Sequence, residues 1–174
     1  YRNKAKINDD IYVSGNLGDS YLGLLVLKNK LKINNRLKKY FIDQYFMPNI
    51  QLKLTEQINK FANTSIDISD GLLADLDKMI NNQKLSYKLF LDDIPISNNF
   101  KKILNLKKLP KINYVSNGDD YQVLFTASKN KMRIIRKIAS NCGVKLTKIG
   151  TIQSNVKKSS IVDHKNIEIR LKNK

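Results

Sequence analysis

The chain has 174 residues, the length of one ordinary domain, and it can bury a hydrophobic core without disulfides. It contains a single cysteine, so no disulfide can form within the chain and a cytoplasmic compartment is expected. No apolar run approaches the ~20 residues that a membrane-spanning helix needs, so membrane association is not expected.

The formal net charge of +17 raises the hypothesis of a nucleic-acid-binding domain. The basic residues are mostly lysines, spread along the chain among many Asn and Ile residues, a mixture typical of an AT-rich genome. Only Leu27–Lys39 forms a dense basic stretch, and a solvated helix face explains it about as well. No nucleic-acid-binding motif is present, so nucleic acid stays an alternative and not the expected ligand.

The first half of the chain predicts one strand followed by helices. Ile11–Val13 is expected to be a strand, and the glycine-containing loop at 14–20 to open a helix from Asp19 to Lys30. A more polar stretch runs from Ile33 to Phe46. The spacing of apolar residues then predicts a helix over Leu52–Phe61.

The second half predicts strands interspersed with helices. Expected strands are Ser65–Ile68, the alternating residues Tyr87, Leu89 and Leu91, then Tyr121–Thr126 and Lys145–Ile149. An apolar stripe predicts a helix over Leu72–Ile80, and Lys129–Cys142 is expected to be another, ended by Gly143. The order of elements predicts an α/β fold, an α+β sandwich in which helices pack on a mixed sheet.

No interior domain boundary is evident. Residues 1–153 are therefore assigned to one domain. The polar tail at 154–174, which has an alternating run at Ile167, Ile169 and Leu171, is assigned to the same domain. A strand-like segment begins almost at once after Tyr1, so an N-terminal part of a larger protein is expected to be missing.

The stretch DISDGL at 67–72 is the most informative for chemistry. Asp67 and Asp70 are three residues apart where a strand becomes a helix, so both carboxylates can point to one side. Two adjacent carboxylates repel unless a cation lies between them, and Mg²⁺ prefers such oxygen ligands. The alternative is structural, with Ser69 or Asp70 capping the helix, whose free N–H groups could also bind a phosphate.

Two further loops carry glycine and acidic residues. Gly15–Ser20 is a strand–loop–helix junction whose glycines could admit a ligand to the backbone, but it lacks the Gly-Lys-Ser/Thr of a Walker loop. A plain turn with Asp19 as cap is the alternative. Gly118–Tyr121 places Asp119 and Asp120 before a strand, either as a tight turn or as carboxylates facing a ligand's cationic or hydroxyl group.

Histidine and cysteine are each present once. His164 lies in the polar tail, and Cys142 is spaced as a core residue of a helix. No Ser–His or Cys–His catalytic set can therefore be built in the body of the chain.

Taken together, these motifs resemble the thiamine-monophosphate kinase family, in the superfamily of aminoimidazole ribonucleotide synthetase and selenophosphate synthetase. The matching strings are DIYVSGNLGDS at 10–20, IDISDGLLADL at 66–76, GDDYQVLFT at 118–126 and Ile149-Gly150. Each motif alone is weak, but their order and spacing over residues 2–152 are specific.

The resemblance implies the C-terminal domain of the aminoimidazole ribonucleotide synthetase-like fold. An N-terminal domain with further magnesium-binding aspartates and the main homodimer contact would be absent from this chain. The implied activity is ATP-dependent phosphorylation of thiamine monophosphate to thiamine diphosphate, with Mg²⁺. The chain alone is then expected to be inactive.

The resemblance also implies roles for individual residues. Asp67 and Asp70 would ligate magnesium, and Arg2 and Ser69 would contact ATP. Asp119 would contact the thiamine substrate at a position where the family usually has Glu.

The sequence also departs from the family pattern. Pro48-Asn49 stands where a Pro-Arg pair is common. The family's substrate-contacting aromatic residue near the C-terminus has no match, so the chain is expected to end before it. A sibling ATP-using enzyme of the same superfamily is the second alternative for the function.

Overall fold

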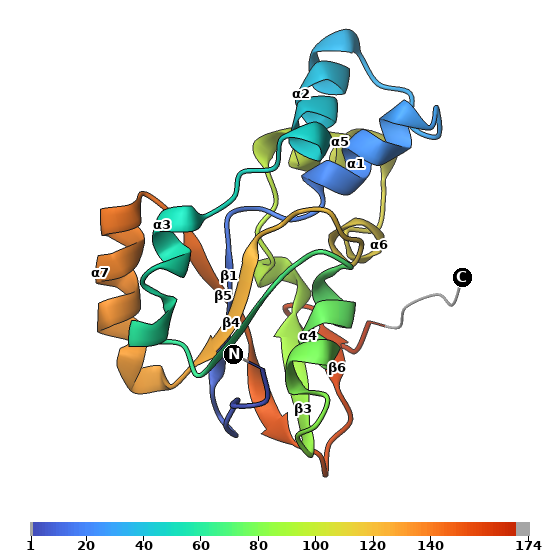
Figure 1. Ribbon diagram of the computed structural model, residues 1–174. Coiled ribbons are helices and arrows are strands. Elements are labelled where there is room, and N and C mark those ends of the chain that lie inside the picture. Colours follow the sequence, from blue (N-terminus) through green and yellow to red (C-terminus); the bar gives the residue numbers. More distant parts are fainter. Residues whose placement is uncertain (1, 170–174) are drawn as a thin grey trace.

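A computed structural model describes residues 2–169 and contains one six-stranded sheet (Figure 1). The strand order is β2-β4-β1-β5-β3-β6, and every neighbouring pair is antiparallel except β3 and β6, which are parallel. The sheet is therefore mixed, as the sequence predicted. The strands are β1 Asp10–Ser14, β2 Thr64–Asp67, β3 Leu85–Phe90, β4 Val123–Ala127, β5 Leu146–Ser154 and β6 Ser160–Val162.

Helices lie on both faces of the sheet and beyond one end of it (Figure 1). Helices α3 and α7 flank one side, α4 lies on the other, and α1, α2 and α5 gather at one end. The helices are α1 Asp19–Leu27, α2 Asn35–Phe46, α3 Leu52–Thr55, α4 Leu72–Ile80, α5 Asn98–Lys107, α6 Ile112–Val115 and α7 Met132–Cys142. Three 3₁₀ turns are η1 Ile58–Lys60, η2 Leu91–Asp93 and η3 Lys129–Lys131.

The alternation of side chains along the strands gives the sheet two hydrophobic cores. On β4, Leu124 belongs to the larger core, which also holds residues of α1, α2, α4 and α5. Its neighbour Phe125 points to the smaller core, where it stacks on Tyr12 of β1 and meets Phe61 edge-on. Successive residues of a strand face opposite sides, so the central strands separate the two cores.

The helix predicted over Leu52–Phe61 is present only in its first part, as α3 Leu52–Thr55, and the chain then forms the 3₁₀ turn η1 Ile58–Lys60. Beyond α3, backbone bonds of the i→i−3 type join Gln57 to Leu54 and Phe61 to Ile58. Such bonds tighten the chain into 3₁₀ turns. Leu54 and Phe61 still both reach the smaller core, which explains why their spacing was misleading.

The first predicted helix ends three residues early, at Leu27 and not at Lys30. Asn29 adopts a left-handed conformation with φ 55°, a region that Asn tolerates better than most residues. The Lys30 and Leu31 N–H groups both turn back to the Leu25 carbonyl, which closes the helix.

Two helices were not predicted, α5 and α6. A signal for α5 was present, because the Ser97 side chain accepts a hydrogen bond from the Phe100 N–H and Phe100 and Ile103 are both buried.

The strand predicted to end near Gly150 continues to Ser154, and the following residues form β6 against β3. In the alternating run of the tail, Ile169 packs on the larger core and Ile167 is exposed, whereas Leu171 lies outside the described residues. Among residues 2–169, no helix has the length and apolarity to cross a membrane.

Candidate functional site

Two loops that are distant in sequence form one unit at the edge of the sheet. The loop after β2 and the loop before β4 are joined by backbone hydrogen bonds because the two strands pair. Asp119 N–H donates to the Ser69 carbonyl at 3.0 Å, and Tyr121 N–H donates to the Ile68 carbonyl at 2.9 Å. Asp119 is thereby brought to the same loop pair as Asp67, Ser69 and Asp70.

Glycine is required at two points of this loop pair. A Cβ on Gly118 would overlap the Ser69 carbonyl oxygen, and a Cβ on Gly71 would overlap the Ser116 carbonyl oxygen. Gly71 also has φ 124°, which side chains rarely allow. The backbones therefore approach more closely than a residue with a side chain at either position would permit.

Asp75 holds the loop after β2 in place. Its Oδ2 atom accepts hydrogen bonds from the N–H groups of Ser69, Asp70 and Gly71 at 2.9, 2.8 and 3.0 Å. The carboxyl group lies in the first turn of α4 and is 1% exposed. Carboxylates are favourable at this end of a helix because the N–H groups and the dipole both attract negative charge.

This arrangement corrects one expectation. Neither Ser69 nor Asp70 caps α4, whose N-cap is Gly71 without a side-chain bond. Asp75 accepts from the N–H groups of Ser69, Asp70 and Gly71, which precede the helix, so these three are not available to a phosphate. Asp75 lies within the recognised string IDISDGLLADL but was not singled out, since only the folded loop shows where its oxygen points.

The two carboxylates predicted to bind a cation, Asp67 and Asp70, are exposed at the end of β2 and in the following loop. Asp70 already contacts the ammonium group of Lys78. Among residues 2–169, no group of three or more His, Cys, Asp or Glu side chains could hold a metal ion. The donor set fits Mg²⁺ in kind, because it consists of carboxylate oxygens, but the described residues supply only part of a coordination shell.

Arg2 does not lie beside Ser69. The segment that follows it packs on the C-terminal end of α4, where Asn3 N–H donates to the Met79 carbonyl at 3.0 Å and Ala5 N–H to the Gln83 side chain at 3.0 Å. Ser69 precedes the N-terminal end of the same helix. Arg2 and Ser69 therefore flank opposite ends of α4, whose nine residues span about 13 Å.

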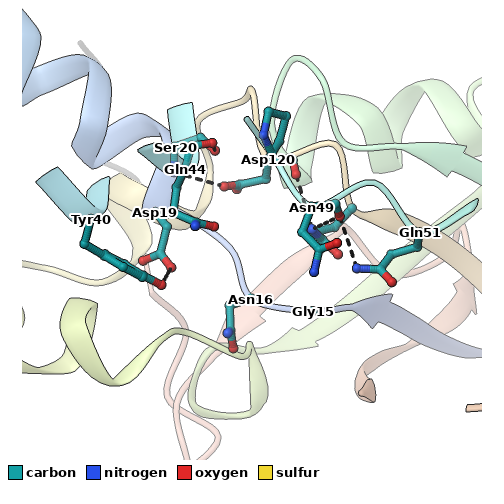
Figure 2. A pocket seen from close by; sticks show the side chains of 11 residues that line it. Gly15, Asn16, Asp19, Ser20, Tyr40, Gln44, Asn49, Gln51 and Asp120 are labelled. Carbon is teal, nitrogen blue, oxygen red and sulfur yellow. Dashed lines mark hydrogen bonds between the residues drawn. The ribbon is translucent and has the colours of Figure 1, made fainter. Parts of the chain in front are cut away.

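A polar cavity of about 100 Å³ lies behind the loop pair (Figure 2). Asp120 turns into it while its neighbour Asp119 does not. Both residues flanking Asp120 have left-handed backbones, with φ 68° at Asp119 and φ 50° at Tyr121. Such conformations are costly for residues other than glycine and persist where the surroundings impose them.

The side chains in this cavity are tied to helix α1. The Asp120 carboxyl accepts from Gly18 N–H at 2.8 Å and from Ser20 N–H at 3.4 Å, so it caps α1 from a distant loop. Asp19 is not the cap: its carboxyl accepts from the hydroxyls of Tyr40 and Ser97, both at 2.8 Å. Figure 2 shows Tyr40 and Asp19 pointing toward each other across the cavity from Asp120.

Burial changes the acidity of both carboxyls. It raises the pKa of Asp19 to about 6, against the opposing hydrogen bonds from Ser97 and Tyr40. It raises the pKa of Asp120 to about 8; the charge of Asp19 adds to this shift, while the Gly18 and Ser20 amides oppose it. Asp120 is thus expected to hold its proton to higher pH than an exposed aspartate does.

No protein-family model matches the chain, but similar proteins and structures are known. Thiamine-monophosphate kinase of Buchnera aphidicola subsp. Acyrthosiphon pisum (strain APS) is 38% identical over 143 residues, covering 78% of this chain and 43% of that protein. The crystal structure of thiamine-monophosphate kinase from Stenotrophomonas maltophilia K279a matches with a TM-score of 0.80 at 27% identity, over 94% of this chain and 52% of that one. A structure of AaThiL complexed with AMPPCP and TMP matches with a TM-score of 0.78 at 27% identity, over 98% of this chain and 52% of that one.

The chain belongs to the thiamine-monophosphate kinase family. Its mixed sheet with flanking helices has the aminoimidazole ribonucleotide synthetase-like fold that the sequence predicted. The chain spans about half the length of the curated relatives it matches.

In this chain, the raised pKa of Asp120 predicts a pH-dependent stability. An unfolded Asp loses its proton near pH 3.9, whereas folded Asp120 keeps it to about pH 8. The folded state then binds more protons, so stability falls as pH rises. Between pH 6 and 8, above the pKa of Asp19, we expect a loss of about 1 kcal/mol per pH unit.

Urea unfolding at pH 6 and pH 8 measures this effect. The side chain introduced by Asp120→Asn cannot ionise. The free energy of unfolding of this variant should therefore differ less between pH 6 and pH 8 than that of the wild type. An equal pH dependence in the wild type and in Asp120→Asn would show that this carboxyl does not titrate in the window.

Proposed function

We propose that the complete protein transfers the γ-phosphoryl group of ATP to thiamine monophosphate and forms thiamine diphosphate, with Mg²⁺ as the cofactor. The observation that supports this proposal is the loop pair, in which the loop that holds Ser69 and Asp70 is joined by a backbone hydrogen bond to the loop that holds Asp119. Further support is the likeness over 98% of this chain to a structure complexed with AMPPCP and TMP.

The nucleophile in this reaction is a phosphate oxygen of thiamine monophosphate, which is already an anion at neutral pH. It forms a bond to the γ-phosphorus while the bond from that phosphorus to the bridging oxygen breaks, and ADP leaves. No general base is required, which agrees with a chain whose one histidine, His164, is at the surface. Catalysis then depends on positioning and on reducing the repulsion between phosphate groups.

Residues of both loops would take part in positioning the substrates and the metal ion. Asp67 and Asp70 would hold Mg²⁺, which when bound supplies positive charge to the phosphate oxygens. Ser69 would position ATP through its hydroxyl, because its N–H is already bonded to Asp75. Asp119 would contact the thiamine substrate from the facing loop, and Arg2 would bind a part of the nucleotide beyond the far end of α4.

The test is ADP release by the full-length protein with thiamine monophosphate and ATP, with Mg²⁺ and with a chelator. We expect release that matches thiamine diphosphate formation and stops when the metal is removed. The 174-residue chain alone is expected not to turn over, because its described residues supply only part of the metal ligands. A homodimer of the intact protein is part of the same proposal.

Two results would contradict the proposal. ADP release without thiamine diphosphate, or no ADP release from a folded protein that binds ATP, would mean that the protein acts on the substrate of a sibling enzyme in the superfamily. Binding to DNA or RNA that weakens steeply with salt, without kinase activity, would favour the nucleic-acid alternative.

A further inference from the structure

Lys78 of α4 lies between two carboxylates of different accessibility. Its ammonium group contacts Asp70 Oδ2 on one side and lies 3.1 Å from Asp75 Oδ1 on the other. The Asp70 side chain is 62% exposed, whereas that of Asp75 is 1% exposed. One partner of Lys78 is therefore open to solvent and to ions, and the other is not.

The two oxygens of Asp75 serve different partners. Oδ2 accepts the three loop N–H groups, which leaves Oδ1 for Lys78. Asp75 is held by the helix and by three hydrogen bonds, so its contact with Lys78 does not depend on Asp70. Ion pairs between exposed groups contribute little to stability, whereas removing the partner of a buried charge costs more.

We propose that Lys78 neutralises Asp70 until a divalent cation binds there. The cation displaces Lys78 from Asp70, and Lys78 then stays bound to Asp75. The inference rests on the proposed function in that it takes Asp70 as a metal ligand. Before the cation binds, Lys78 neutralises Asp70. Afterwards it remains on Asp75, three residues along the same helix, and keeps its charge beside the site.

The charges around Lys78 support this exchange. Asp70 and Asp75 carry two negative charges and Lys78 one positive charge, so the set stays negative and attracts a cation. Because the exposed Asp70–Lys78 pair is weak, its replacement by a doubly charged ion is favourable.

The test is a Mn²⁺ titration of the 174-residue chain, followed by paramagnetic broadening of backbone amide signals at residues 67–71. This measurement needs no substrate and detects weak binding. We expect Lys78→Met to bind Mn²⁺ about threefold more tightly than the wild type, because the competing cation is gone. Lys102→Met, which removes an exposed charge from α5, is the matched control and should leave the affinity unchanged.

A double-mutant comparison separates direct competition from general electrostatics. Asp70→Asn should weaken Mn²⁺ binding, and in that background Lys78→Met should have little further effect. Unchanged or weaker binding by Lys78→Met alone would overturn the proposal, as would an undiminished effect in the Asp70→Asn background. Absence of broadening in the wild type would overturn it as well, while the kinase assay on the full-length protein would still decide the function.

Discussion

The substitution Asp75→Ala is expected to lower the free energy of unfolding by about 4 kcal/mol. It leaves the N–H groups of Ser69, Asp70 and Gly71 without their acceptor, and each bond to a charged group contributes about 1.5–3 kcal/mol. It also removes the buried partner of Lys78. Because domains are stable by only about 5–15 kcal/mol, this is a large share of the total.

Urea denaturation of the purified variants measures the loss. Asp75→Asn keeps the shape and one acceptor oxygen without the charge, so its stability should fall between those of the wild type and Asp75→Ala. Asp93→Ala is the matched control, since Asp93 is exposed, and its effect should remain within about 0.5 kcal/mol. If Asp75→Ala were as stable as this control, the loop would not depend on Asp75.

Elements with a strong local period could be predicted from the sequence. The stripe of buried residues in α4, from Leu72 to Ile80, and the glycine that ends α7 both follow from neighbours within two turns. The mixed sheet also followed from the order of segments. The spacing of apolar residues over Leu52–Phe61 was misleading as a helix signal. Leu54 and Phe61 both pack in the smaller core, although no continuous helix connects them.

The site could be predicted only as separate motifs. Its loops at 67–71 and 118–121 were both singled out, but their backbone contact depends on the pairing of β2 with β4 across about fifty residues of sequence. Asp75 accepts from N–H groups four to six residues earlier in the chain, whereas the capping of α1 by Asp120 joins residues 102 positions apart. Sequence spacing cannot give the direction of a buried carboxyl, so the acceptor role of Asp75 and the capping role of Asp120 were missed.

The substitution Gly118→Ala is expected to separate the two loops of the site and to cost about 3 kcal/mol of stability. Its Cβ would overlap the Ser69 carbonyl oxygen and approach the Ser69 and Asp70 carbonyl carbons at 2.8 and 2.9 Å. All three are backbone atoms, which cannot move aside by a change of rotamer. The loop after β2 would have to shift, and the bond from Asp119 N–H to the Ser69 carbonyl would be lost.

Gly143→Ala is the matched control for this prediction. A Cβ on Gly143 meets no atom within 4 Å, but its φ of 65° is unfavourable for alanine, so a cost of about 1 kcal/mol is expected. Gly118 has no positive φ, and its cost therefore arises from the contact alone. In the full-length protein, Gly118→Ala should also raise the KM for thiamine monophosphate, since Asp119 moves with the loop, whereas Gly143→Ala should not. Equal losses of stability in the two variants, with an unchanged KM, would mean that the close approach of the loops does not hold the site together.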